Sequence, residues 1–239
     1  MRVLLINPNT SAHVTDLVAA HVRAQLGDQA ELRAVTGRFG ARYIASRAAA
    51  SIAGHAALDA LAEHGAECDA VYLACFGDPG LLALRELSRV PVIGMAEAAC
   101  REAAAAGRFG IVTGGAAWEP MLREFVAALG LSDALAALHT VAPSGGAIAR
   151  DPDAALATLA EACRACAASG AERVILGGAG LAGLARRIAA QVPVPLICSV
   201  EAGTRAVLAA GATGTVRFRP EPVESVGLAP ALAARLVDP

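Results

Sequence analysis

A cysteine at the end of an apolar run is the feature of this sequence best suited to chemistry. The run at 71–74 ends in Cys75, and Asp78 and Pro79 follow shortly after it. We expect Asp78 to be the N-cap and Pro79 the first residue of the next helix. The positive end of that helix would lower the thiol pKa from about 8.5 towards neutrality. Cys75 is therefore predicted to be a thiolate that acts as a base or as a nucleophile.

The segment around Cys75 recurs once, and the second copy lacks the thiol. Residues 71–77 read Val-Tyr-Leu-Ala-Cys-Phe-Gly and residues 174–180 read Val-Ile-Leu-Gly-Gly-Ala-Gly, so Gly178 stands where Cys75 stood. Both copies continue to Val-Pro-Val and then to Glu-Ala with almost the same spacing. A duplicated fold places equivalent loops on both sides of a pseudo-twofold axis. We expect Cys75 on one wall of a shared cleft and Gly178 on the other.

Apolar β-rich runs alternate with helical patterns along the chain, which predicts an α/β fold of parallel strands and crossover helices. The predicted strands are 2–7, 30–36, 70–75, 91–94, 109–113, 138–142, 173–177 and 194–198. The predicted helices are 11–26, 44–65, 79–88, 96–106, 117–129, 152–169, 181–190 and 200–210.

The repeat divides this fold into two pseudo-symmetric, flavodoxin-like halves. We expect residues 1–95 and about 199–239 to form the first half and residues 96–198 to form the second. Ligands of such sheets bind at the carboxyl ends of the strands. The predicted active site is therefore the cleft between the two halves.

Four predicted loops meet at this cleft, and they supply the candidate substrate-binding groups. Their amides, hydroxyls and backbone N–H groups are suited to a carboxylate or an imide oxygen. The candidate substrate-binding residues are Asn7, Asn9, Thr10, Phe76, Gly77, Thr113, Gly114 and Ala179. Capping of the following helix explains one residue of the 7–11 loop, and not all of them. The loop 38–43 is a candidate lid.

The remaining cysteines and the histidines carry no comparable signal. Cys163 and Cys166 have the spacing of a metal or redox pair, but they lie in an Ala-rich helical segment without a second pair, so we expect packing. The five histidines lack ligand spacing, and no metal site is predicted. Cys198 ends a predicted strand near the Gly178 loop, and it is a candidate substitute acid for the missing thiol.

Composition excludes several classes of protein. The 239 residues are 56% apolar with a net charge of −2, which gives no reason to expect nucleic acid or an anionic membrane as partner. No apolar run reaches the roughly 20 residues of a membrane span. Six cysteines without a framework pattern favour a reducing cytoplasm, and the Ala-rich surface favours a homo-oligomer.

Four motifs resemble the hydantoin racemase branch of the aspartate/glutamate racemase superfamily. They are Leu-Ile-Asn-Pro-Asn-Thr-Ser at 5–11, Cys-Phe-Gly-Asp-Pro-Gly-Leu at 75–81, Pro-Val-Ile-Gly-Met-Ala-Glu-Ala at 91–98 and Leu-Gly-Gly-Ala-Gly-Leu-Ala-Gly at 176–183. The resemblance covers essentially the whole chain. It implies two pseudo-symmetric halves, no cofactor, and two cysteines that exchange a Cα proton from opposite sides. The second of these cysteines belongs at Gly178, where this chain has none.

The resemblance implies a cofactor-independent racemase or isomerase that acts next to a carbonyl of a small molecule: a hydantoin, allantoin, an amino acid or another carboxylate. Cys75 would be the thiolate base. Two alternatives stay open because Gly178 carries no proton. The first is a one-cysteine lyase, decarboxylase or cis–trans isomerase that uses Cys75 as acid, base or nucleophile. The second is a non-catalytic binder of a related ligand.

Overall fold

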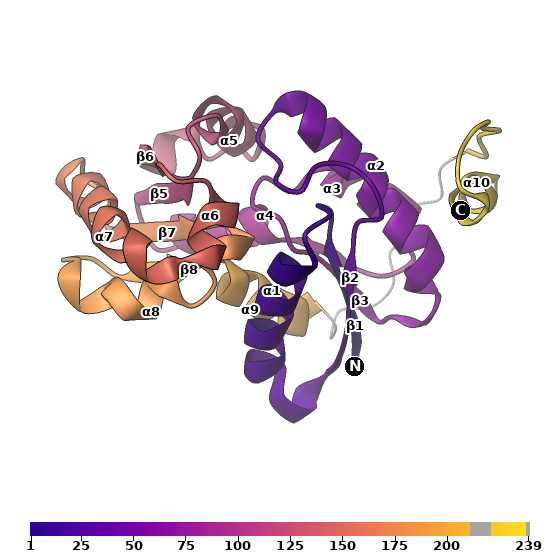
Figure 1. The fold of residues 1–239 in the computed structure, drawn as a ribbon, viewed down its shortest axis with the longest axis horizontal. Coiled ribbons are helices and arrows are strands. Elements are labelled where there is room, and N and C mark those ends of the chain that lie inside the picture. The colour runs from indigo at the N-terminus through magenta and orange to yellow at the C-terminus, as the bar shows by residue number, and fades with distance from the viewer. Residues whose placement is uncertain (211–220, 238–239) are drawn as a thin grey trace.

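A computed structural model describes residues 1–210 and 221–237 of the chain (Figure 1). The strands are β1 (Arg2–Asn7), β2 (Glu31–Thr36), β3 (Ala70–Leu73), β4 (Val92–Gly94), β5 (Phe109–Gly114), β6 (Leu135–Val141), β7 (Arg173–Gly177) and β8 (Leu196–Cys198). The α-helices are α1 (Ala12–Leu26), α2 (Arg47–His64), α3 (Leu81–Leu87), α4 (Met95–Ala104), α5 (Trp118–Ala128), α6 (Gly145–Arg150), α7 (Pro152–Ala168), α8 (Leu184–Ile188), α9 (Ser199–Ala210) and α10 (Pro230–Val237). A short 3-10 turn, η4 (Ala179–Leu181), follows β7.

The strands form two four-stranded parallel sheets, which confirms the predicted fold class. The first sheet has the order β2-β1-β3-β4, and the second has the corresponding order β6-β5-β7-β8. Helices flank both sheets, and Figure 1 shows the sheets side by side with α4 and α9 between them. In each sheet the central pair is the first and third strand, and Cys75 or Gly178 follows the third strand of its sheet.

The first sheet is buried on both faces because its side chains alternate between two layers of helices. Val3 and Leu5 face the large core that α1, α4 and α9 share with the second sheet. Leu4 and Ile6 face a smaller core made with α2, α3 and α10. Strands covered in this way need apolar residues at consecutive positions, as the sequence has.

All eight predicted strands are present, and the differences lie at the ends of elements and in short helices. The strand predicted at 138–142 begins earlier, at Leu135. The helix predicted at 181–190 is largely replaced by turns and the short α8, because Gly183 has a left-handed backbone with φ of 78°. The sequence pattern predicts neither α6 nor α10, although the Ser144 side chain caps α6 by accepting a hydrogen bond from the Ala147 N–H.

Two helices connect the halves of the molecule. Helix α4 follows the first sheet and contacts β7 and β8 of the second, whereas α9 follows the second sheet and contacts α1, β3 and β4. Helix α10 packs on α2, far from the second sheet (Figure 1). We therefore propose that the C-terminal segment belongs with the first half, and the boundaries 1–95 with 199–239 and 96–198 stay a prediction. Residues 211–220 and 238–239 of that segment lie outside the described residues.

Candidate active site

A small cavity lies between the two sheets, at the carboxyl ends of their central strands. The space in which the centre of a water molecule can move measures about 50 Å³, several times the roughly 10–15 Å³ that one water needs. Its lining carries no charged side chain among the described residues. The lining residues are Asn9, Val14, Tyr43, Ile44, Cys75, Phe76, Thr113, Trp118, Gly145, Gly146, Gly178, Ala179, Gly180 and Leu181.

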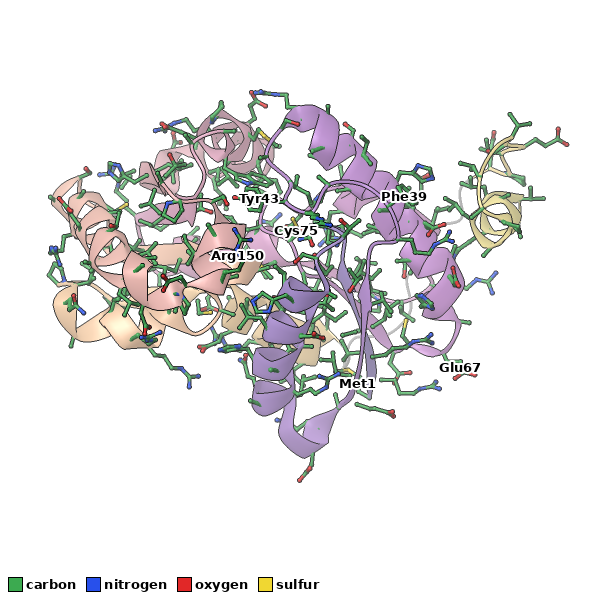
Figure 2. All side chains as sticks on the ribbon, in the orientation of Figure 1. Met1, Phe39, Tyr43, Glu67, Cys75 and Arg150 are labelled. Carbon is green, nitrogen blue, oxygen red and sulfur yellow. The ribbon has the colours of Figure 1, made fainter. Side chains whose placement is uncertain are left out.

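Cys75 lies on one wall of this cavity, in the region between the two sheets (Figure 2). Only 7% of its surface is exposed. Burial raises the pKa of the Cys75 thiol far above its ordinary value, and the nearby Asp78 carboxyl raises this pKa further. The expected lowering of the pKa is therefore wrong for the free protein, because the thiolate would lose its hydration. Cys75 rests as a protonated thiol.

The same loop shows why the expected helix end does not assist the thiol. Helix α3 begins at Leu81 after Gly80, so Asp78 is not its N-cap and Pro79 is not its first residue. Asp78 instead accepts hydrogen bonds from the backbone N–H groups of Ala96 and Glu97, in the first turn of α4. Asp78 therefore caps α4, a later helix, and not α3, the helix that follows it directly. The Asp78 N–H also donates to the Cys75 carbonyl, at 3.1 Å.

Gly178 lies on the cavity wall contributed by the second sheet. A Cβ placed on it would meet only Leu181 Cδ1 at 3.3 Å and Thr113 Oγ1 at 3.8 Å, so a side chain here would extend beside Thr113. The φ of Gly178 is 140°, a conformation that residues with a side chain rarely adopt. Its N–H donates to the Ser199 hydroxyl. Gly178 therefore leaves room in the cavity and contributes no acid or base.

The loop 7–11 divides into one binding candidate and two structural residues. Asn9 lines the cavity, and its side-chain oxygen accepts hydrogen bonds from Asn7 and from the Ser11 N–H. Its Nδ2 group has no partner among the described residues and is available to a ligand. Asn7 is fully buried, and its amide bonds to Asn9, Ser11 and Thr15. Thr10 donates its backbone N–H to Ala41 and holds the next loop.

The predicted residues at the carboxyl ends of β3, β5 and β7 also divide in this way. Phe76 lines the cavity, and its ring lies against Gly177 of the second half, where any Cβ would overlap it. Gly77 lies beneath the Trp118 ring and is not part of the lining. Gly114 is absent from the lining, and its carbonyl accepts a hydrogen bond from the Tyr43 hydroxyl. Ala179 lines the cavity.

Backbone donors surround the cavity at both walls. The N–H groups of Phe76, Gly77, Ala179 and Gly180 have no acceptor in the part of the chain that the structure describes. Phe76 is buried and the other three residues are partly buried, and free N–H groups beside a cavity can bind a ligand oxygen.

The predicted lid at 38–43 reaches the site through one residue. The Tyr43 hydroxyl donates to the Gly114 carbonyl at 2.7 Å, and the Tyr43 ring lies against Gly145 and Gly146 of the second half. Arg38 instead binds Asp59 of α2. Phe39 contacts the His55 ring, and Figure 2 shows it well away from Cys75.

Cys198 does not reach the cavity. It ends β8, pairs with Leu176 in the sheet register, and is buried in the core. Cys163 and Cys166 are buried, free thiols of α7, as packing requires. Within residues 1–210 and 221–237, no three His, Cys, Asp or Glu side chains gather as a metal site. Over the same ranges, no helix combines the length and apolar character of a membrane span.

The sequence did not predict Trp118, Gly145 and Gly146 as lining residues of the site. Trp118 begins α5, and Gly145 and Gly146 begin α6, so none of the three ends a strand. Val14 and Ile44 face the cavity from α1 and from the 37–46 loop. The apolar type of these residues predicts burial and cannot distinguish a cavity wall from a core.

The comparisons agree with this architecture. The sequence profile of the Asp/Glu/hydantoin racemase family matches residues 3–207. A hydantoin racemase from Paenarthrobacter aurescens is 36% identical over 211 residues, covering 86% of this chain and 89% of that protein. A hydantoin racemase from a Pseudomonas species is 30% identical over 208 residues, covering 86% of this chain and 84% of that protein.

A solved structure of an allantoin racemase from Klebsiella pneumoniae superimposes with a TM-score of 0.90. It is 33% identical in sequence, and the match covers 97% of this chain and 98% of that one. The profile match, the relatives and the paired sheets around one cavity lead to the same conclusion: this chain belongs to the Asp/Glu/hydantoin racemase family.

Proposed function

We propose that this chain is a cofactor-independent racemase that moves a proton at the carbon next to a carbonyl of a small cyclic substrate, with Cys75 as the reacting group. The observation that carries this proposal is a single thiol in a small cavity between two equivalent sheets. The family membership and the hydantoin and allantoin racemases among its relatives support it. The cytoplasmic location and the homo-oligomer stay predictions.

The charge of the cavity favours a neutral substrate. A carboxylate buried without a cation or many hydrogen bonds loses most of its hydration energy. The described lining offers no Lys, Arg or His to replace that energy. A hydantoin or allantoin ring is neutral, and it presents imide oxygens and N–H groups to donors and acceptors. We therefore place hydantoin-type rings ahead of amino acids and dicarboxylates.

The walls of the cavity also suit a flat ring with polar edges. Tyr43, Phe76 and Trp118 supply aromatic surface. The Asn9 amide and the free N–H groups near both walls can bind carbonyl oxygens. Such donors stabilise the negative charge that develops on oxygen when the neighbouring C–H ionises.

The buried thiol sets the order of events at Cys75. The thiol must ionise before it can remove a proton, and its raised pKa makes the thiolate scarce near neutral pH. The same raised pKa makes each thiolate a stronger base towards a weak carbon acid. The Cys75 thiolate then takes the Cα proton, and the substrate becomes an enolate held by the donors.

Gly178 favours one alternative, a one-sided lyase or isomerase in which Cys75 acts alone. The described cavity wall opposite Cys75 carries no second thiol. The uncharged lining, however, is poorly suited to the malonates and maleate on which such reactions act. We therefore rank the one-sided lyase or isomerase below the racemase.

Proton NMR in deuterated water tests the proposal. The panel is 5-substituted hydantoins, allantoin, aspartate, glutamate, arylmalonates and maleate, each with the wild type, Cys75→Ala and Cys198→Ala. We expect deuterium at Cα of the cyclic ureides only, abolished in Cys75→Ala and retained in Cys198→Ala, which removes a thiol outside the cavity. Turnover of a malonate or maleate would favour the alternative. Ligand binding without turnover would favour a non-catalytic binder.

A further inference from the structure

The two cavity walls differ in the residue that follows the third strand of each sheet, β3 or β7. Cys75 supplies a thiol on one wall, and Gly178 leaves space on the other. Inversion at Cα needs a proton on the face that the thiol does not reach. The question is which group in this chain delivers it.

Thr113 is the polar side chain next to that space. Its hydroxyl oxygen lies 3.8 Å from the point where a Cβ on Gly178 would stand. Thr113 is only 5% exposed and lines the cavity. Its side chain therefore faces the cavity on the Gly178 wall.

The Thr113 hydroxyl has no hydrogen-bond partner among the described residues, and its oxygen is accessible from the cavity that the residue lines. Two other buried threonines show the common arrangement: Thr15 bonds to Thr36, and Thr204 donates to the Val200 carbonyl. The sheet registers make Thr113 the counterpart of Asn7, whose amide is fully bonded. A free hydroxyl that faces the cavity at this position is available to a bound molecule.

A water molecule fits the role of this hydrogen-bond partner. A buried water needs two to four polar contacts and a space of roughly 10–15 Å³ for its centre. The Thr113 hydroxyl and the unpaired N–H groups of Ala179 and Gly180 supply polar contacts around Gly178. The whole cavity offers about 50 Å³ to the centre of a water molecule. One bound water therefore occupies only part of the cavity and leaves the rest for a ligand.

We propose that Thr113 positions a water molecule beside Gly178, and that this water protonates the substrate on the face opposite Cys75. The inference rests on the proposed function. Thr113 is then a positioning residue, and the water replaces the thiol that the repeat lacks.

The steps balance without a further reactant. The Cys75 thiolate takes the Cα proton, so the C–H bond breaks, an S–H bond forms, and the electron pair moves to the carbonyl oxygen. The water gives its proton to the opposite face of Cα and becomes hydroxide. Solvent returns a proton to this hydroxide and removes one from the Cys75 thiol. The net reaction is inversion, with nothing oxidised or reduced.

This scheme predicts an asymmetry that can be measured. Water is a weaker acid than the Cys75 thiol, even though burial raises the pKa of that thiol. The enolate is therefore reprotonated more often by Cys75 than by the water. Once the Cys75 S–H has exchanged its hydrogen with deuterated solvent, its return to Cα gives deuterium exchange with retained configuration, and we expect this exchange to be faster than inversion.

The test uses one enantiomer of 5-methylhydantoin in deuterated water, with exchange followed by NMR and inversion by polarimetry. The spontaneous rate without enzyme is subtracted. The variants are Thr113→Val, which keeps the shape and removes the hydroxyl, and Thr113→Ser, which keeps the hydroxyl. We expect Thr113→Val to slow inversion about tenfold or more while exchange changes less than about twofold. Thr113→Ser should retain both rates, and a melting curve checks that each variant is folded.

Three outcomes overturn the inference. In the first, Thr113→Val keeps its full inversion rate. In the second, Thr113→Val loses exchange and inversion equally, which would indicate a structural role. In the third, the wild type exchanges without inverting, which refutes the water and leaves the Cys75 chemistry intact. Absence of exchange in the wild type would instead refute the proposed function itself.

Discussion

Replacement of Asp78 should destabilise the protein, because this residue caps a helix that has no cap of its own. Helix α4 begins after Gly94, which has no side chain to accept a hydrogen bond. Asp78 Oδ1 accepts from the Ala96 N–H at 2.9 Å, and Oδ2 accepts from the Glu97 N–H at 2.7 Å. A Cβ on Gly94 would overlap the Asp78 carboxyl, so glycine is required for this approach.

The magnitude follows from the two bonds. Asp78 is only 4% exposed, so water cannot readily replace the lost acceptors. Each buried N–H left without an acceptor costs about 1–3 kcal/mol. Asp78→Ala should therefore lower the free energy of unfolding by about 2–6 kcal/mol. Asp78→Asn keeps one acceptor oxygen and should lower it by about 1–3 kcal/mol.

The pH dependence has a definite sign. Burial raises the pKa of the Asp78 carboxyl to about 7, against the two N–H bonds that lower it. The folded state therefore binds this proton more tightly than the unfolded chain, whose Asp pKa is about 3.9. Stability from this group is fully present below pH 3.9 and is lost as the pH rises through about 7. The penalty for Asp78→Ala should be larger at pH 5.5 than at pH 8.5.

The assay is urea unfolding of the wild type, both Asp78 variants and Asp28→Ala, at these two pH values. Asp28 is exposed, so its variant should stay within about 0.5 kcal/mol of the wild type. An Asp78→Ala variant as stable as Asp28→Ala at pH 5.5 would refute the capping argument. A penalty that grows with pH would show that the ionised carboxylate is the favoured form in the fold.

Three further predictions concern the cavity. Because burial raises the pKa of the Cys75 thiol, kcat/KM for a hydantoin should rise about tenfold per pH unit between pH 7 and 9; a flat profile there would contradict a buried thiol as the base. Tyr43→Phe removes the hydrogen bond to Gly114, worth about 0.5–1.5 kcal/mol, so ligand affinity should fall about 2- to 12-fold. Titration of Trp118 fluorescence measures that affinity, since it is the single tryptophan and lines the cavity; unchanged affinity would show that the loop does not contribute to binding. Gly178→Cys should raise the ratio of inversion to Cα exchange and lower the melting temperature, because a φ of 140° strains a side chain by about 1–3 kcal/mol; an unchanged ratio would mean that residue 178 does not face the substrate.

The sequence predicted the sheets well because buried parallel strands leave a strong and local signal. Runs such as 3–6 are apolar at every position, since helices cover both faces of the sheet. The repeat located Cys75 and Gly178 for a similar reason: equivalent strands place equivalent residues at the same edge. Short helices were harder to predict. Helix α6 begins with two glycines, which usually indicate a loop, and its cap comes from Ser144.

The parts of the site that the sequence did not predict depend on contacts distant in the chain. Asp78 has the local pattern of a cap, but its partners Ala96 and Glu97 both lie in a later helix, α4. Asn7 has the polar character of a binding residue, but its amide bonds to Asn9 of its own loop and to Thr15 of α1. The Cys75 pKa depends on how completely the second half covers the thiol, which no local pattern records.

Tyr72 has a consequence for how the protein is made. It lies in β3, is fully buried, and donates its hydroxyl to the carbonyl of Val200 in α9. A Cβ on Gly203 would overlap the Tyr72 ring, so α9 closes tightly over the first sheet. Chains are synthesised from the N-terminus at roughly 5–20 residues per second. The Tyr72 hydroxyl of the first sheet therefore has no partner for several seconds, until α9 has emerged from the ribosome. Fragments truncated before Val200 should aggregate through that uncovered face.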